Sequence, residues 1–315
     1  MKILVTGGCG YKGHVLVPKL LEKGHEVVVI DTMWFGNFLE PSNNLSFIKA
    51  DLRDKTAYSV DGIDKVIHLA SVANDPCADL DPVLTWEVST LATLELLIKC
   101  KKSNVRQFIY ASSGSVYGVK TEPHVTEELD LVPISAYNKT KMVAERLVLN
   151  FAESFNIQII RPATVCGLSP RMRLDVAVNL LTAQAFKNGL MTVLGGSQVR
   201  PNIHIEDITD LYVFLLGKPN LTGIFNAGFE NISILDIAEQ IAKLSGAKIE
   251  IEASNDPRSY RLDSSKLLKT GFTPKFKVAD AINQVFDALN QRKLEDNDRC
   301  YNLKWMNSIR EKINI

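Results

Sequence analysis

Two side chains that could transfer a proton lie four residues apart near the middle of the chain. Tyr137 and Lys141, in the run YNKTK, fall on one face of a helix predicted over about 136–155. A tyrosine is a poor base near neutral pH unless its phenolate is stabilised. A lysine ammonium group one turn away would stabilise the phenolate by Coulomb attraction. The pair therefore predicts a tyrosine that removes the proton of a substrate hydroxyl while hydride leaves for a cofactor.

A third polar side chain gives this pair a context, because a tyrosine and a lysine at this spacing are frequent by chance. Ser113 lies in the run SSGSVYG, directly after a predicted strand over 107–111. The carboxyl edge of a parallel sheet is where such folds bind their ligands. Ser113 is therefore expected to hold or polarise the reacting hydroxyl.

A glycine-rich turn after the first predicted strand indicates a dinucleotide site. Gly7, Gly10 and Gly13 follow the strand over 2–6 and open a helix. Glycines at this spacing permit a tight turn and a close approach of the backbone to a pyrophosphate, which then faces a helix N-terminus. Asp31 ends the next strand, 18 residues after Gly13, where a carboxylate accepts from both ribose hydroxyls and repels a 2′-phosphate. NAD is therefore favoured over NADP, although a plain strand-end turn residue is the alternative for Asp31.

The elements that must position these residues alternate along the first half of the chain. Strands are predicted at 2–6, 26–30, 45–48, 65–69, 107–111 and 157–160, with helices at 15–23, 82–102 and 136–155. Two more helices are predicted at 235–244 and 278–290. This order predicts an α/β fold, a Rossmann-type doubly wound parallel sheet with a smaller mixed α/β substrate-binding lobe. We expect residues 1–166, with returns near 200–230, to form the NAD-binding domain and residues 167–315 mainly the substrate-binding lobe.

The composition of the chain argues against several classes of binding partner. Lys plus Arg equals Asp plus Glu at 36 each, so no net positive field is available for nucleic acid. The five cysteines are scattered, which predicts free thiols, no disulfide framework and no metal site. The N-terminus lacks the long apolar run of a signal peptide or membrane span. We expect a cytoplasmic protein that does not bind a membrane.

Several runs together resemble one family. TGGCGYKG, VVVID, ADLRD, HLA, SSGSVYG, SAYNKTK and RPATVCG occur in the order and spacing of the extended short-chain dehydrogenase/reductases, and RPNIHIED and DSSK extend the likeness to about residue 290. The nearest group is the NAD-dependent nucleotide-sugar epimerases and dehydratases, and within it the UDP-glucose 4-epimerases. The resemblance implies Ser113, Tyr137 and Lys141 as the catalytic triad. It implies as NAD-binding residues Gly7, Gly10, Tyr11, Lys12, Gly13, Asp31, Asp51, Leu52, Leu69, Ala70, Ser71, Tyr137, Lys141 and Pro162.

A second group of residues is expected to contact the substrate. The resemblance implies substrate contacts by Ser115, Thr164, Asn179, Arg200 and Arg258, of which Arg200 fits a phosphate-binding arginine best. Three basic residues have two possible interpretations, and two histidines and a cysteine are expected to be structural. Lys12 either contacts a phosphate or lies along the surface, and for Arg171 and Arg173 surface solvation is at least as good an interpretation. His68, His204 and Cys166 are expected to be structural.

Departures from the family's sequence pattern limit the reactions that we expect this chain to catalyse. The sugar dehydratases carry an Asp-Glu pair where this chain has Gly114 and Ser115, so elimination of water is disfavoured. The first hypothesis is a nucleotide-sugar epimerase, acting at C4 through a transient 4-keto intermediate, on a UDP- or GDP-sugar. A nucleotide-sugar 4-dehydrogenase that releases the keto-sugar is the alternative, and a non-catalytic NAD-binding regulator is the third. Relatives form a four-helix dimer interface at the helices over 82–102 and 136–155, so the resemblance implies a homodimer.

Overall fold

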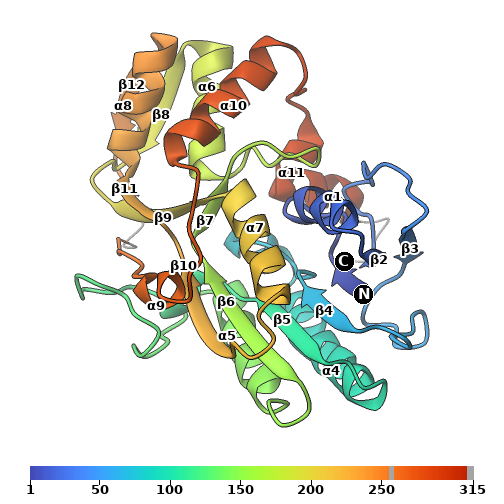
Figure 1. Ribbon diagram of the computed structural model, residues 1–315. Coiled ribbons are helices and arrows are strands. Elements are labelled where there is room, and N and C mark those ends of the chain that lie inside the picture. Colours follow the sequence, from blue (N-terminus) through green and yellow to red (C-terminus); the bar gives the residue numbers. More distant parts are fainter. Residues whose placement is uncertain (255–258, 311–315) are drawn as a thin grey trace.

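A seven-stranded parallel sheet forms the centre of the molecule (Figure 1). The computed structural model describes residues 1–254 and 259–310. The strand order is β10-β6-β5-β4-β1-β2-β3. The strands are β1 (Lys2–Thr6), β2 (Glu26–Asp31), β3 (Leu45–Lys49), β4 (Lys65–His68), β5 (Gln107–Ala111), β6 (Asn156–Pro162) and β10 (Gly223–Ala227). The predicted Rossmann-type fold is confirmed, and the seventh strand comes from residues far along the chain.

Both faces of the sheet are covered by helices, which explains why its strands are continuous apolar runs. Side chains alternate along β1: Ile3 and Val5 pack with α1 (Gly13–Glu22) and α7 (Ile205–Leu216). Leu4 faces the other way and packs with α4 (Ala92–Lys102) and α5 (Ala136–Leu149). Each face therefore has its own apolar core, and the carboxyl edge of the sheet stays open for a ligand.

The strand order reverses at β1. From β1 the chain runs outward through β2 and β3, then crosses to β4 on the other side and continues through β5 and β6. The loops that follow β1 and β4 therefore leave the sheet side by side in opposite directions. Such a switch point is where open α/β sheets bind ligands.

Two predicted helices differ in detail from the observed ones. The helix predicted over 82–102 consists of α3 (Pro82–Trp86), a π-helical turn η1 (Glu87–Leu91) and α4. At this turn the Ser89 hydroxyl lies 3.1 Å from that of Ser71, on the loop after β4. The helix predicted to reach residue 155 ends at Leu149, and the rings of Phe151 and Phe155 stack beyond it at 5.9 Å.

The second lobe holds two small sheets. One has the order β11 (Glu230–Ser233), β9 (Val199–His204), β7 (Thr164–Cys166), and the other pairs β8 (Leu190–Leu194) with β12 (Lys248–Glu252). The helices α6 (Ala177–Asn188), α8 (Ile234–Ser245) and α10 (Val278–Asn290) pack against them around a separate apolar core. Short elements complete the described chain: α2 (Asp75–Leu80), η2 (Gly114–Tyr117), α9 (Ser265–Leu268), η3 (Asp298–Cys300) and α11 (Asn302–Ile309).

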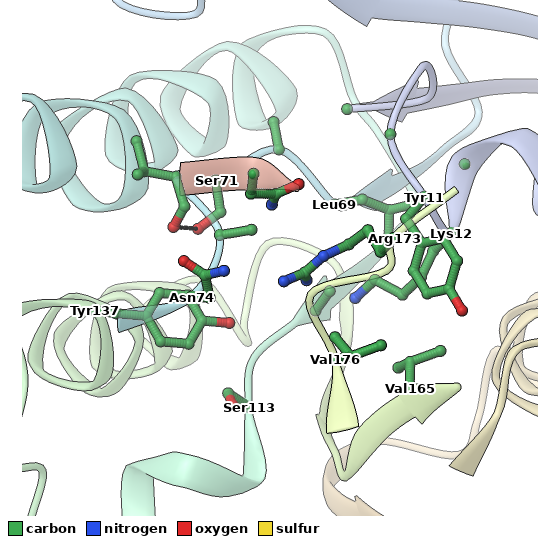
Figure 2. A pocket seen from close by; sticks show the side chains of 18 of the residues that line it. Tyr11, Lys12, Leu69, Ser71, Asn74, Ser113, Tyr137, Val165, Arg173 and Val176 are labelled. Carbon is green, nitrogen blue, oxygen red and sulfur yellow. Dashed lines mark hydrogen bonds between the residues drawn. The ribbon is translucent and has the colours of Figure 1, made fainter. Parts of the chain in front are cut away.

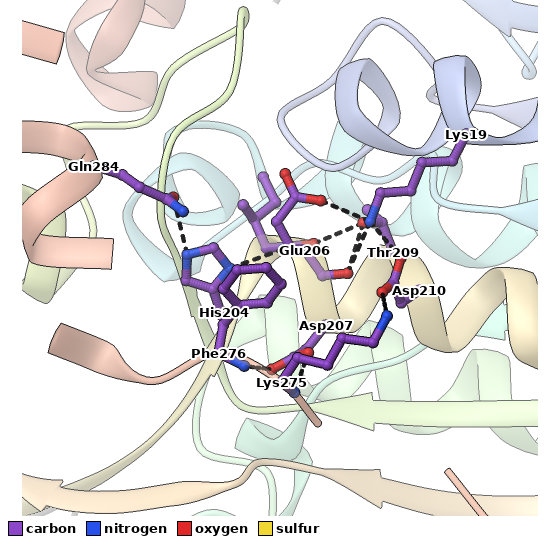
Figure 3. A network of polar contacts seen from close by, with 10 residues as sticks. Lys19, His204, Glu206, Asp207, Thr209, Asp210, Lys275, Phe276 and Gln284 are labelled. Carbon is purple, nitrogen blue, oxygen red and sulfur yellow. Dashed lines mark hydrogen bonds and ion pairs between the residues drawn. The ribbon is translucent and has the colours of Figure 1, made fainter. Parts of the chain in front are cut away.

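A polar network ties the two lobes together at the start of α7 (Figure 3). Lys19 of α1 forms ion pairs with Glu206 at 2.7 Å and with Asp210 at 2.5 Å. The carboxylate of Asp207 accepts from the backbone N–H groups of Lys275 and Phe276 at 2.8 and 3.0 Å. The network thus joins α1, the start of α7 and the segment that precedes α10.

Candidate active site

A cavity of about 530 Å³ opens at the switch point of the sheet, between the two lobes. Its walls come from the loops after β1, β2, β4 and β5, the start of α5, the end of β6 and the segment before α6. All of the predicted triad residues and predicted NAD-binding residues line it, as do the predicted substrate residues Ser115, Thr164 and Arg200. Figure 2 shows Tyr137, Ser113 and Lys12 around the same space. The structure thus brings together residues from the loop after the first strand and from the second half of the chain.

The glycine-rich turn has the close contacts that its sequence predicts. Gly7 has a φ of +70°, and a Cβ atom there would lie 2.7 Å from the backbone nitrogen of Ala70. A Cβ atom on Gly13 would lie 2.2 Å from the carbonyl oxygen of Gly8. The first position therefore needs glycine for its conformation and its contact with the loop after β4, and the second for the packing of α1. The turn leaves backbone N–H groups at the N-terminus of α1 facing the cavity.

Asp31 ends β2 inside the cavity wall and organises the turn. Its carboxylate accepts from the backbone N–H of Cys9 at 2.9 Å and from that of Met33 at 2.7 Å. Burial raises the pKa of this carboxyl group, and these two hydrogen bonds oppose the rise. Each carboxylate oxygen can accept more than one hydrogen bond, so Asp31 keeps acceptor capacity for a ribose.

The start of α5 places the two predicted proton-transfer residues. Ser135 caps the helix by accepting from the backbone N–H of Asn138 at 3.1 Å, which puts Tyr137 in the first turn. Lys141, one turn later, is buried and donates to the carbonyl of Ala111 at 2.8 Å. Burial lowers the pKa of Lys141 to about 7, and the nearby charge of Lys12 contributes.

The pKa of the Tyr137 phenol depends on burial and on two neighbouring side chains. Burial raises its pKa, while a hydrogen bond with the Ser113 side chain and the positive charge of Arg173 lower it. Ser113 also lies 2.7 Å from the Ser115 hydroxyl, so three hydroxyl groups meet at this point. In this structure, then, Arg173 is the cation that acts on Tyr137; the stabilisation by Lys141 stays a prediction.

Two arginines before α6 lie inside the site, so the interpretation of solvated surface residues is wrong. Arg171 is 4% exposed, and the Arg173 side chain is 15% exposed and pairs with Asp175 at 2.8 Å. Both line the cavity, and Figure 2 shows Arg173 and Lys12 pointing into the same space. Burial and the charge of Arg173 lower the pKa of Lys12 to about 8. The cavity wall therefore carries a cluster of cations, Lys12, Lys141, Arg171 and Arg173, which suits a ligand with several phosphates.

The structure does not bring every predicted substrate residue to the cavity. Asn179 is fully buried behind its wall, where its amide donates to the carbonyl of Arg173 at 2.8 Å and accepts from the N–H of Gly167 at 3.0 Å. It therefore holds the arginine-bearing loop in place. Arg258 lies outside the described residues.

The residues expected to be structural have structural surroundings. His68 is fully buried, with Nδ1 2.6 Å from the Thr6 hydroxyl and Nε2 2.9 Å from that of Thr93. His204 caps α7 by accepting from the N–H of Glu206 at 3.1 Å. Cys166 is fully buried, and burial raises the pKa of its thiol, so it is a poor nucleophile.

Several residues of the cavity wall carry no sequence signal of their own. They belong to the loop after β2, the N-cap and first residue of α2, or the C-terminal segment: Trp34, Phe35, Asn74, Asp75, Asn302 and Met306. Of the residues missed, only the two arginines in PRMRLD offered a signal, as paired cations soon after a strand end. None of the described helices is long and apolar enough to cross a membrane.

Comparison with known proteins identifies the family. The model of the NAD dependent epimerase/dehydratase family matches residues 3–228, which include the glycine turn, Asp31, Ser113, Tyr137 and Lys141. The chain belongs to this family. NAD is accordingly its cofactor, as predicted, and the residues around the cavity fit it: a turn that only glycines permit, a carboxylate at the end of β2 and a cationic wall.

Individual members of the epimerase/dehydratase family are similar over nearly the whole chain. A Bacillus subtilis (strain 168) protein named as an uncharacterized UDP-glucose epimerase is 32% identical, covering 84% of this chain and 90% of its own. UDP-glucose 4-epimerase of Lactobacillus helveticus is 27% identical, covering 90% and 94%. The structure of UDP-glucuronic acid 4-epimerase from Bacillus cereus, in complex with UDP-glucuronic acid and NAD, is 30% identical. It covers 93% of this chain and 100% of its own, with a TM-score of 0.81.

Proposed function

We propose that this protein is an NAD-dependent nucleotide-sugar 4-epimerase with Tyr137 as its base. The observation that carries the proposal is the convergence of Ser113, Tyr137 and Lys141 on the one cavity whose walls also hold the glycine turn and Asp31. The Lactobacillus helveticus relative named as a UDP-glucose 4-epimerase supports it, as does the Bacillus subtilis relative named as a UDP-glucose epimerase. A hydroxyl bound beside Tyr137 would lie within reach of both its base and its cofactor.

The chain's own residues would divide the work as follows. The glycine turn, Asp31 and the basic side chains of the wall would hold NAD, which would supply the acceptor and then the donor for the hydride exchanged with C4 of the sugar. Tyr137 would remove the C4 hydroxyl proton and return it after the 4-keto sugar has rotated in the site. Ser113 would hold the C4 oxygen by a hydrogen bond. The cationic side chains of Lys141 and Arg173 would stabilise the phenolate. General acid–base catalysis of this kind contributes about 10²- to 10⁴-fold to a rate.

We propose a UDP-sugar as the substrate. The names of the similar proteins support uridine: the Bacillus cereus structure contains UDP-glucuronic acid, and the Lactobacillus helveticus enzyme is a UDP-glucose 4-epimerase. Arg200 in the cavity wall would bind its diphosphate, and Ser115 and Thr164 would contact the sugar. Elimination of water is disfavoured because Gly114 has no side chain and the Ser115 hydroxyl is held by hydrogen bonds to Ser113 and Asn138.

The test is incubation of the purified protein with UDP-glucose, UDP-galactose, UDP-glucuronic acid, UDP-arabinose and GDP-mannose. Sugar products are followed by NMR and reduced cofactor by absorbance. We expect one UDP-sugar to be inverted at C4 without a lasting reduced-cofactor signal. A keto-sugar accumulating with reduced cofactor would instead establish the 4-dehydrogenase alternative. No turnover of any sugar would support a non-catalytic NAD-binding protein.

Replacing Asp31 with alanine should weaken NAD binding by about 10- to 100-fold, because a hydrogen bond to a charged group contributes about 1.5–3 kcal/mol. NADP binding should weaken much less, since the carboxylate no longer repels the 2′-phosphate. The ratio of the two dissociation constants, measured by calorimetry, removes any general loosening of the turn. An unchanged ratio would show that Asp31 does not contact the ribose.

Binding of NAD at pH 8 should be accompanied by proton uptake. In the cavity without ligand the pKa of Lys12 is lowered to about 8 and that of Lys141 to about 7, so both are partly or mostly neutral at this pH. A nearby anion favours the charged form and raises each pKa, so both groups gain protons when the pyrophosphate binds. Calorimetry in buffers of different ionisation enthalpy measures the uptake, and Lys12→Met should reduce it. Release of protons would contradict the placement of the phosphates.

We further propose a cytoplasmic homodimer in which residues 1–166, with returns near 200–230, bind NAD and residues 167–315 mainly bind substrate. The helical segment over 82–102 supports the dimer, because Val83 and Leu91 on it are 67% and 58% exposed. The five cysteines are free, which suits a reducing compartment. Sedimentation of Leu91→Glu against the parent protein tests the dimer contact.

A further inference from the structure

The C-terminal segment, residues 298–309, returns from the second lobe to the NAD end of the cavity. It comprises η3 and α11, and it lies beyond the residues that the family model matches. Two of its side chains, Asn302 and Met306, line the cavity together with Trp34 and Phe35 from the loop after β2. Both are buried, at 3% exposed each. A wall of the cofactor cavity is therefore built from the far end of the chain.

The segment is held there by specific contacts. The indole N–H of Trp305 donates to the carbonyl of Trp34 at 2.7 Å, and the backbone N–H of Asn302 donates to the carboxylate of Asp175 at 3.0 Å. The side chain of Met306 packs in an apolar cluster with Cys77 of α2 and with Leu84 of α3. These contacts join α11 to the loop after β2, to the loop before α6 and to the helices α2 and α3.

Arg171 connects this segment to the ligand space. One of its terminal nitrogens donates to the Asn302 side-chain oxygen at 2.6 Å, and its guanidinium group lies 3.9 Å from the centre of the Phe35 ring. Among the described residues no acceptor reaches its Nε, although that atom is buried. A buried donor without a partner costs about 1–3 kcal/mol, so it points to a ligand that completes the site. The charges of Arg171 and Asp31 act on each other, which places Arg171 at the adenosine end of the cavity.

We propose that Arg171, held by Asn302 and stacked on Phe35, binds an oxygen of the adenosine diphosphate half of NAD, and that α11 covers this half. An arginine is suited to this task because its planar donors match phosphate oxygens. The residues beside it complete the fit: Asp31 for the ribose, Met306 and Phe35 as apolar cover. NAD can then leave only when the C-terminal segment moves away. A cofactor that must stay bound through both halves of an epimerisation benefits from such an enclosure.

The test measures the binding of NAD and of UDP separately, by calorimetry and by the rate at which a fluorescent NAD analogue leaves the protein. Arg171→Met should raise the dissociation constant of NAD by about 10- to 100-fold, the expected loss of a charged hydrogen bond. Asn302→Ala should raise both it and the exit rate by several-fold, with the UDP dissociation constant unchanged within twofold. Lys304→Ala is the matched control, because Lys304 lies on the same helix with its side chain 65% exposed and pairs with Asp298 at the surface.

The outcomes separate this inference from the proposed function. A folded Arg171→Met protein with unchanged NAD binding would overturn the inference while leaving the 4-epimerase activity standing. Weaker UDP binding with unchanged NAD binding would also overturn it, by assigning Arg171 to the substrate. Should Arg171→Met fail to fold, as judged by circular dichroism, Arg171→Lys and Asn302→Ala carry the test. An NAD exit rate in Asn302→Ala equal to that of Lys304→Ala would contradict the role of the C-terminal segment.

Discussion

Replacing Tyr137 with phenylalanine is expected to slow epimerisation by about 10²- to 10⁴-fold, the contribution of general acid–base catalysis, while NAD stays bound. The substitution removes one hydroxyl group and keeps the ring, so the wall of the cavity is preserved. The lost group is the one to which Ser113 is hydrogen-bonded and on which the charge of Arg173 acts. The rate is measured by NMR of the nucleotide sugar, and NAD binding by calorimetry.

A matched variant separates chemistry from packing. Tyr58 is a buried tyrosine whose hydroxyl has no hydrogen-bond partner among the described residues, and it does not line the cavity. Tyr58→Phe should therefore leave the turnover rate within about twofold of the parent, since it removes no interaction that the structure shows. Retained turnover in Tyr137→Phe would remove Tyr137 from the mechanism.

Replacing Arg161 with methionine is expected to lower the free energy of unfolding by about 3–5 kcal/mol, because it leaves a buried carboxylate without its partner. Arg161 and Glu145 are 3% and 1% exposed at their side chains and lie 2.6 Å apart. Glu145 is one turn after Lys141 on α5, and it also accepts from Ser112 at the end of β5. The pair therefore joins α5, which carries Tyr137 and Lys141, to β6 of the central sheet. Urea denaturation followed by circular dichroism measures the loss.

The double variant Glu145→Leu with Arg161→Met distinguishes a lost pair from lost packing. Replacing both charges by apolar groups of similar size is often neutral or stabilising, because no charge is then left buried. We expect the double variant to recover most of the stability that Arg161→Met loses. A loss of less than about 1 kcal/mol in the single variant would contradict the assignment of a costly unpaired charge to this position.

The sequence predicts the cofactor half of the site because that half is built from short-range rules. Most of its residues lie at or just after the end of a strand, and parallel strands end at one edge, so Gly7, Asp31 and Leu69 meet there, as does Ser113 of the triad. The spacing of Tyr137 and Lys141 is likewise set by one helical turn. These positions depend on local patterns that a single chain displays.

The parts that could not be predicted depend on contacts between distant segments. Arg171 in PRMRLD is a surface residue by composition, and its contacts with Asn302, 131 positions later, and with Phe35 help to bury it. The residues of α11 form an ordinary amphipathic pattern whose partner lies across the molecule at Trp34. Asn179 shows the opposite case. The sequence predicts its side chain in the cavity, but that side chain lies behind the cavity wall and donates a hydrogen bond to the carbonyl of Arg173. Periodicity and composition contain no information on which loops meet.

The measurement that tests the central claim most directly follows a deuterium atom at C4 of the UDP-sugar that the protein inverts. The labelled sugar is incubated with the NAD-loaded protein in ordinary water, and both epimers are examined by NMR and mass spectrometry. Transfer away from C4 and back to its other face inside a closed cavity predicts that the deuterium remains at C4 of both epimers, with none lost to water. Loss of the label to solvent, or its appearance in released reduced cofactor beside a 4-keto sugar, would contradict the account.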